Sequence, residues 1–285
     1  MNGDVPRTSK SAAKLSSIRG SIARILALML VCAVALQLYF ASRVAAMAFI
    51  DPHSTSFQRS EIFRIATTRL QLPWRQQWVP YDAIAESLKQ AVIASEDAGF
   101  VEHSGVEWDA VEKAWERNQQ AEAAALKLEE QARRRSGSSA AAAKGREPAA
   151  GGAARAAKPA RAPKVVGGST ITQQLAKNLF LGGERSLARK GQEFVITALL
   201  EALLSKERIL EIYLNSVEWG EGVFGAEAAA RHYFRVPAAA LAPWQSARLA
   251  VMLPAPKRFE KRPASPYLLG RSATVLARMG AVETP

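Results

Sequence analysis

The sequence predicts a mainly α-helical protein that begins with one membrane-spanning helix. Apolar residues recur at spacings of three and four in several segments, whereas no segment shows a sustained two-residue alternation. The chain has 285 residues, of which 48% are hydrophobic, and this is enough for one domain core with extensions. The predicted helices of the body cover residues 82–96, 187–204, 206–215 and 239–253.

The first predicted helix is the membrane span. Residues 25–41 are apolar and uncharged, and they lie between Arg24 and Arg43. At about 1.5 Å per residue this stretch makes roughly 25 Å of helix, close to the thickness of a bilayer core of about 30 Å. We therefore expect residues 25–43 to be a transmembrane signal anchor. Because the basic tail, residues 1–24, precedes the span, the tail is expected in the cytoplasm and the body in the periplasm.

Two alternatives stay open for this helix. A cleaved signal peptide would have a shorter apolar stretch, although Ala46-Met47-Ala48 resembles a cleavage site. A buried core helix would be apolar too, and the length of the stretch favours the anchor over both. We interpret residues 44–77 as a membrane-proximal segment and residues 78–285 as the domain.

The formal net charge of +12 is unevenly distributed. The basic excess lies in residues 1–24 and 117–164, and the remaining sequence is nearly neutral. A nucleic-acid-binding protein would carry its charge on the folded body, so no nucleic-acid partner is expected. Residues 121–164 form a low-complexity basic insertion with few large apolar residues, too few to order most of it. It is either a solvated loop or a contact for anionic lipid headgroups.

Adjacent carboxylates end the helix predicted over residues 82–96. Glu96 and Asp97 follow its apolar stripe directly. A carboxylate at the end of a buried helix can be partly desolvated, and this raises its pKa toward the value of a general base. The spacing alone favours the simpler alternative, a pair of solvated charges at a helix end.

A second candidate segment starts at Gly167-Gly168 and continues with hydroxyl and amide side chains into a predicted helix. The free N–H groups at a helix start favour phosphate or pyrophosphate. Alternatively, Thr170 and Gln173 form an ordinary capping box. The third segment places Arg185, Arg189 and Lys190 at the start of another helix, where acidic residues are usual, and this favours an anionic ligand.

Other catalytic classes find little support. The three histidines show no metal-ligand spacing, and the single cysteine, Cys32, lies in the predicted span. Neither a Walker A loop nor a Gly-x-Ser-x-Gly elbow is present.

Four motifs in this order resemble one family closely. They are Glu96-Asp97-x-x-Phe100-x-x-His103-x-Gly105, then GGSTITQQLAKNLFL from Gly167, then Arg185-Ser186-x-x-Arg189-Lys190-x-x-Glu193, then Lys206-x-x-Ile209-Leu210-Glu211-x-Tyr213-Leu214-Asn215. The chain resembles the peptidoglycan glycosyltransferases of family 51, specifically the monofunctional biosynthetic transglycosylases of Gram-negative bacteria. The resemblance runs from about residue 78 to 266, outside the insertion.

The resemblance implies a lysozyme-like glycosyltransferase domain that polymerises lipid II into β-1,4-linked glycan with inversion and release of undecaprenyl pyrophosphate. It implies a location at the bacterial inner membrane. Lipid II, the growing glycan strand and proteins of cell division or elongation are the implied partners. A lysozyme-like lytic enzyme, which would cleave peptidoglycan glycan, is the alternative.

The resemblance also implies roles for individual residues. Glu96 would be the general base, and Glu193 would act near the leaving pyrophosphate, directly or through a divalent ion such as Mg²⁺ or Mn²⁺. No nucleotide or organic cofactor is expected. The implied pyrophosphate cations are Lys177, Arg185, Arg189 and Lys190, and the implied groove residues are Ser169, Thr170, Gln173, Gln174 and Asn178.

Two features depart from the family pattern. The insertion between the first and second motifs replaces a short loop. Gln245 stands where the family usually has Glu, and we expect this change to affect packing or a salt bridge rather than chemistry.

Overall fold

The structure is a computed structural model that describes residues 8–68, 73–108, 112, 116, 120, 169–184 and 186–285. The whole predicted insertion, residues 121–164, therefore lies outside the described residues, and so does Arg185.

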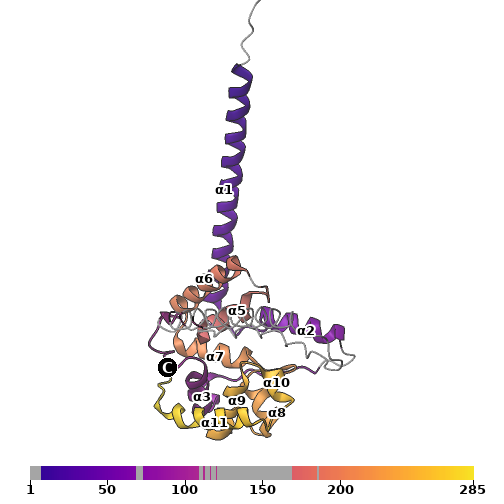
Figure 1. The fold of residues 1–285 in the computed structure, drawn as a ribbon, viewed down its shortest axis with the longest axis vertical. Helices are drawn as coiled ribbons and strands as arrows, with labels where there is room; N and C mark the ends of the chain where they lie inside the picture. Colours follow the sequence, from indigo (N-terminus) through magenta and orange to yellow (C-terminus); the bar gives the residue numbers. More distant parts are fainter. Residues whose placement is uncertain are drawn as a thin grey trace, which may run out of the picture.

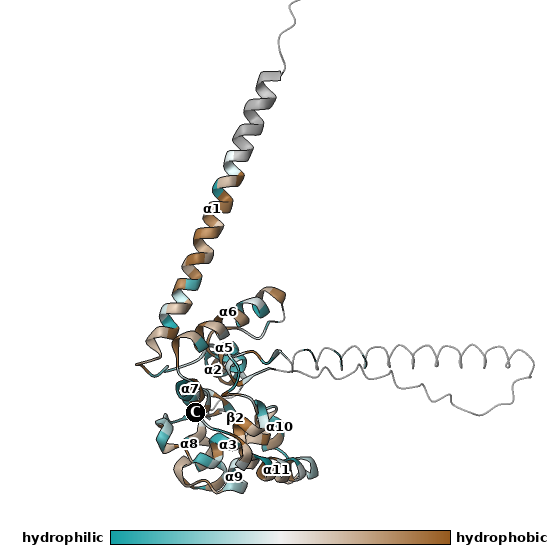
Figure 2. Cartoon of the chain, turned by 90° about the vertical axis from the view of Figure 1, so that its left-hand side faces the viewer, coloured by the Kyte–Doolittle hydropathy of each residue, from teal (hydrophilic) through white to brown (hydrophobic). Residues whose placement is uncertain are grey.

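The N-terminal helix α1 (Thr8–Ala46) extends away from the body of the protein (Figure 1). Within it, the 27 residues Gly20–Ala46 are long and apolar enough to cross a membrane. Figure 2 shows this apolar stretch in brown, and only 6% of its most apolar window is buried. A core helix would be mostly buried, so the exposure contradicts that alternative and agrees with a membrane anchor.

The last turns of α1 pack into the domain. Phe40, Val44 and Met47 are buried in the hydrophobic core. The amides of Gln37 and Gln192 exchange two hydrogen bonds, with N···O distances of 2.9 and 3.1 Å. The anchor is therefore joined directly to α6 (Leu187–Leu203).

The predicted body helices are present with shifted ends. Residues 82–96 form a short 3₁₀ turn, Tyr81–Ala83, followed by α3 (Glu86–Glu96). Ser186 and Ser205 accept hydrogen bonds from backbone N–H groups and so cap α6 and α7 (Lys206–Ser216). The last predicted helix is α9 (Pro243–Met252), and it packs against α3 in the core.

Several other helices complete the body: α2 (Ser56–Thr68), α5 (Ile171–Phe180), α8 (Ala226–Phe234), α10 (Pro256–Glu260) and α11 (Pro266–Arg278). Residues 44–77, interpreted above as a membrane-proximal segment, contain α2, which packs against α5. Figure 1 shows α2, α5 and α6 on the side of the body that faces α1, whereas α8, α9 and α11 lie on the far side.

A small sheet joins distant parts of the chain. Its strands are β1 (Arg75–Gln76), β2 (Glu218–Gly220) and β3 (Val223–Phe224), in the order β1-β3-β2. β3 is parallel to β1 and antiparallel to β2. Gly222 has φ +75°, and a Cβ there would lie 1.6 Å from the carbonyl oxygen of Pro73. Strands of two or three residues are too short to show the alternation that identifies a strand in a sequence.

Candidate active site

Two adjacent carboxylates at the end of α3, Glu96 and Asp97, lie in different environments. Asp97 is buried, and its Oδ1 lies 2.7 Å from His103 Nε2. Its Oδ2 accepts a hydrogen bond of 2.9 Å from the N–H of Ile171, the first residue of α5. Asp97 therefore connects the first motif to the start of α5, and it is not a solvated helix-end charge.

His103 holds the loop that follows. The N–H of Gly105 donates to His103 Nδ1 over 3.1 Å, so the neutral ring carries its proton on Nε2 and donates it to Asp97. The hydrogen bond to Asp97 raises the pKa of His103, which burial opposes. Gly105 has φ +83°, and a Cβ there would lie 2.7 Å from Thr197 Cγ2. Only glycine fits this position without strain.

Glu96 is half-buried and belongs to a short chain of hydrogen bonds. Its Oε2 accepts from Gln174 Nε2 over 3.0 Å, and Gln174 Oε1 accepts from the hydroxyl of Tyr213 over 3.0 Å. Burial holds the pKa of Tyr213 well above its usual range, so this hydroxyl stays a donor and fixes the orientation of the Gln174 amide. Burial also raises the pKa of Glu96, while the hydrogen bonds from Gln174 and Ser95 oppose the rise.

The start of α5 forms the capping box that the sequence offered as the simpler reading. Thr170 Oγ1 accepts from the N–H of Gln173, and Gln173 Oε1 accepts from the N–H of Thr170. The hydroxyl of Thr170 also donates to the carbonyl oxygen of Gly105 over 2.6 Å. Both side chains are buried, so they hold the start of α5 in place and do not face solvent. Ser169, which precedes them, is exposed.

The first turns of α6 gather charge around Glu193, which is buried. Arg189 Nη1 donates to Glu193 Oε2 over 3.0 Å, and Lys190 Nζ contacts Glu193 Oε1. Arg189 Nε is buried and has no hydrogen-bond partner in the structure. Lys177 of α5 lies near this group, and its pKa is lowered by loss of hydration and by the charges of Arg189 and Lys190, while Glu193 opposes the shift. Three cations thus lie around one carboxylate.

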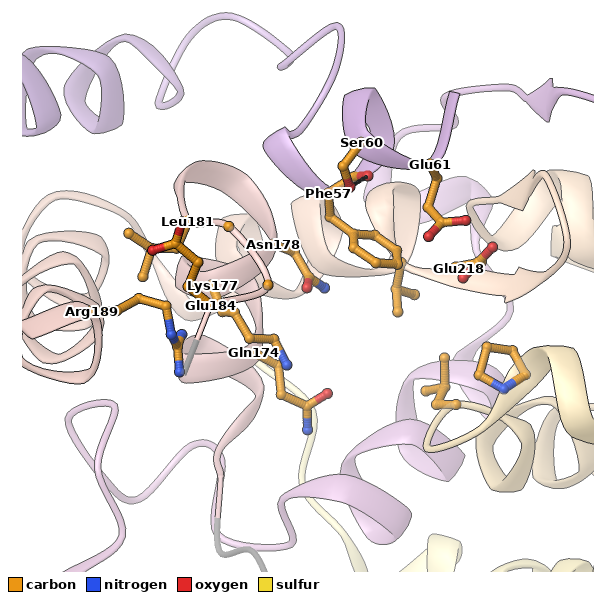
Figure 3. Close-up of a pocket in the computed structure, with 15 residues that line it drawn as sticks. Phe57, Ser60, Glu61, Gln174, Lys177, Asn178, Leu181, Glu184, Arg189 and Glu218 are labelled. Carbon is orange, nitrogen blue, oxygen red and sulfur yellow. Dashed lines mark hydrogen bonds between the residues drawn. The ribbon is translucent and has the colours of Figure 1, made fainter. Parts of the chain in front are cut away.

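A cleft of about 600 Å³ is lined by Gln174, Lys177 and Arg189 and by residues from outside the motifs (Figure 3). What we call its α5–α6 end is lined by Gln174, Lys177, Asn178 and Arg189. Its α2–β2 end is lined by Phe57, Ser60, Glu61, Val217 and Glu218. Glu96 does not line the cleft itself but is hydrogen-bonded to Gln174, which does. The volume is typical of a site for a small molecule or part of a larger one.

A resident divalent ion near Glu193 does not fit the residues that the structure describes. Both oxygens of Glu193 are held by cationic side chains, which would repel a second positive charge. Within the described ranges, no three acidic, histidine or cysteine side chains gather as a metal site. The cations Lys177, Arg189 and Lys190 supply the positive charge here.

No sequence motif indicates the α2–β2 end of the cleft. Phe57 and Glu61 lie in the segment interpreted as membrane-proximal, and Glu218 lies in a strand too short to recognise. They are identified only in the folded structure, where they line the same cleft. Gln245, in contrast, accepts a hydrogen bond of 2.8 Å from the N–H of Ala242, so it caps the start of α9 and does not line the cleft.

Comparison with known proteins agrees with this arrangement. The transglycosylase family model matches residues 64–138 and 144–280. A protein of Burkholderia thailandensis named biosynthetic peptidoglycan transglycosylase is 49% identical over 251 residues, which are 88% of this chain and 82% of the relative. A Bordetella pertussis protein of the same name is 46% identical over 275 residues, which are 96% of this chain and 98% of the relative.

A third relative of that name, from Paraburkholderia xenovorans, is 47% identical over 251 residues, 88% of each chain. The mainly helical, lysozyme-like fold that the resemblance implied is thereby confirmed. With most of its length matched, this chain belongs to the transglycosylase family.

Proposed function

We propose that this protein is a peptidoglycan glycosyltransferase that polymerises lipid II into β-1,4-linked glycan strands and releases undecaprenyl pyrophosphate. The observation that carries the proposal is that Gln174 of α5 binds the half-buried carboxylate of Glu96 and lines the same cleft as the cations Lys177 and Arg189. A lytic enzyme would need the carboxylate but has no pyrophosphate to stabilise.

Glu96 takes the proton of the attacking hydroxyl. The acceptor oxygen forms its bond to C1 of the donor sugar, its proton moves to Glu96, and the C1–O bond to pyrophosphate breaks. A raised pKa brings the base closer to neutral pH, where proton transfer is most effective. Gln174, fixed by Tyr213, holds the carboxylate in one orientation.

Lys177, Arg189 and Lys190 stabilise the negative charge that develops on the leaving pyrophosphate. Glu193 acts here as a positioning residue, because it holds Arg189 and Lys190 side by side against their mutual repulsion. Preorganised cations of this kind need no reorganisation when the bond breaks.

The protein is anchored by α1 in the bacterial inner membrane, with the basic tail in the cytoplasm and the body in the periplasm. A lipid-linked substrate stays in the same membrane, so an anchored enzyme meets it without leaving the surface. Protease treatment of spheroplasts tests this orientation: we expect the body to be digested, and protection of the body would contradict it.

The central experiment compares purified full-length wild type with Glu96→Gln in detergent on lipid II, with the products separated as glycan strands on a gel. We expect polymer from wild type and a loss of about 10²- to 10⁴-fold in rate for Glu96→Gln. Glu102→Gln is the matched control, since Glu102 is an exposed carboxylate on the same loop.

Polymer from both wild type and a folded Glu96→Gln would remove Glu96 from its role. Cleavage of preformed glycan without polymerisation would instead identify a lytic enzyme and overturn the proposed function.

A further inference from the structure

Two buried side-chain atoms in the part of the chain that the structure describes have no hydrogen-bond partner, and their residues line the same cleft. They are Arg189 Nε at the α5–α6 end and Glu218 Oε1 at the α2–β2 end. An N–H donor and a carboxylate acceptor therefore lie at opposite ends. Buried polar groups are nearly always paired, so two exceptions in one cleft point to a ligand that accepts at one end and donates at the other.

Glu218 is positioned to accept a hydrogen bond from such a ligand. Its side chain is 6% exposed, and Lys257 Nζ lies 3.3 Å from Oε1, close enough for an ion pair but without a hydrogen bond. The hydrogen bonds of Lys257 go elsewhere, to Glu61 Oε2 over 2.5 Å. Figure 3 shows the carboxylates of Glu61 and Glu218 facing each other across this end of the cleft.

The pKa values of the two carboxylates are shifted in opposite directions. Burial raises the pKa of Glu218 to about 7, with Lys257 opposing the rise. Burial alone would raise the pKa of Glu61 as well, but hydrogen bonds from Arg64 and Lys257 lower it. Arg64 and Lys257 thus both donate to Glu61 Oε2. Glu218 Oε1 is ion-paired with Lys257 but accepts no hydrogen bond, so it can accept one from a ligand.

An aromatic ring lines the same end of the cleft. Phe57 of α2 is half-buried, and its ring is held edge-to-face against Phe224 with centroids 6.3 Å apart. In Figure 3 it lies between Asn178 and the two glutamates. An aromatic ring offers an apolar surface, and a carboxylate offers a strong acceptor for hydroxyl groups. A sugar has both an apolar ring face and hydroxyl donors.

We propose that Phe57 and Glu218 form a saccharide subsite at the α2–β2 end of the cleft. The ring packs against the apolar face of a sugar, and Glu218 Oε1 accepts a hydrogen bond from one of its hydroxyls. This inference rests on the proposed function, since the sugar arrives as part of the lipid-linked substrate or the growing strand. The family model begins at residue 64, so Phe57 lies outside its match.

The test is equilibrium binding of fluorescently labelled lipid II to the full-length protein in detergent, which needs no turnover. We expect Glu218→Gln to weaken binding by roughly tenfold, the effect of losing one hydrogen bond to a charged group. Phe57→Leu should weaken it by about two- to tenfold. Undecaprenyl pyrophosphate, which carries no sugar, should bind all variants equally.

Each variant has a matched control. Glu227 is a buried carboxylate whose oxygens accept from Arg231 and from the N–H of Ala238, outside the residues that line the cleft. Glu227→Gln therefore reports the cost of neutralising a buried glutamate without changing the subsite. Phe63 lies on the same helix as Phe57 and is 73% exposed, so Phe63→Leu controls for the aromatic change.

The outcomes separate the two proposals. Weaker lipid II binding by Glu218→Gln and Phe57→Leu supports a subsite for the incoming substrate. Unchanged binding with shorter glycan strands places the growing strand there instead, and still supports a saccharide subsite. Unchanged binding and unchanged strand length overturn the subsite, even when wild type polymerises lipid II.

If wild type binds lipid II in the way described but makes no polymer, the proposed function fails while the subsite stands. If Glu218→Gln does not fold, Phe57→Leu with its control Phe63→Leu decides the question.

Discussion

The two ends of the cleft use charge in different ways. At the α5–α6 end, Lys177, Arg189 and Lys190 outnumber the carboxylates of Glu184 and Glu193. At the α2–β2 end, Glu61 and Glu218 share the cation Lys257. The excess of positive charge at one end suits bond breaking at a pyrophosphate, whereas one spare acceptor at the other end suits recognition of a neutral, hydroxyl-rich group.

Because of this difference, we expect substitutions at the two ends to change different kinetic parameters. Changes at the α5–α6 end should lower kcat, because the pyrophosphate, already anionic in the bound substrate, gains further negative charge as its bond to C1 breaks. Changes at the α2–β2 end should weaken binding and leave kcat nearly unchanged, because a sugar hydroxyl makes the same contact throughout the reaction.

Among changes that compare the two ends of the cleft, the largest effect is expected for Arg189→Lys, which keeps the charge but removes the buried Nε–H and the planar fork. A lost preorganised donor costs about 10²- to 10³-fold in kcat. Steady-state polymerisation of lipid II measures it. Arg231→Lys is the control, since Arg231 also pairs with a glutamate one turn away but is largely exposed. A rise in KM alone would show that the two ends do not differ.

The next largest effect is expected in the pH dependence of kcat/KM. Glu96 must be ionised to act as a base, so kcat/KM is retained above its pKa and falls up to tenfold per pH unit below it. Because burial raises that pKa, the decline should lie at higher pH than for an exposed glutamate. Glu218 has a pKa of about 7 and also titrates. The decline should therefore persist in Glu218→Gln, and its disappearance would assign it to Glu218.

Asp97→Asn should mainly lower the free energy of unfolding, with less effect on kcat or on substrate binding. The amide can replace only one of the two acceptor oxygens that face His103 and the N–H of Ile171. One buried group is left unsatisfied, which costs about 1–3 kcal/mol of unfolding free energy. Denaturant titration measures this loss. Wild-type stability would show that Asp97 does not fix the start of α5.

The smallest effect is expected for Gln37→Leu in α1. It removes the two amide hydrogen bonds to Gln192, next to Glu193 in the sequence. A hydrogen bond of this kind contributes about 0.5–1.5 kcal/mol net to stability. Thermal unfolding in detergent should show a slight loss of stability, with lipid II binding unchanged. Gln192→Leu should give the same loss, and a double variant should add little to it.

Much of the α5–α6 end could be predicted from the sequence. Glu96, Gln174, Lys177, Arg189 and Glu193 all lie in motifs that the resemblance carries, and the structure brings them together. The same motifs could not tell which residues face the cleft. Thr170 and Gln173 are buried in a helix cap, while Gln174, the next residue, reaches Glu96.

The α2–β2 end could not be predicted. Phe57 and Glu218 are more than a hundred residues apart, and neither lies in a motif. Even the adjacent pair Glu96 and Asp97 was ambiguous, because their different burial is set by α5 and by His103 rather than by local sequence.

The sequence by itself determined the anchor, the helices of the body and the family, because these follow from local periodicity, length and ordered motifs. The tertiary structure alone decided which carboxylates are buried, which cations pair, and which side chains share the cleft. The physical reason is that burial and pairing depend on contacts between segments far apart in the chain, and no local pattern records those contacts.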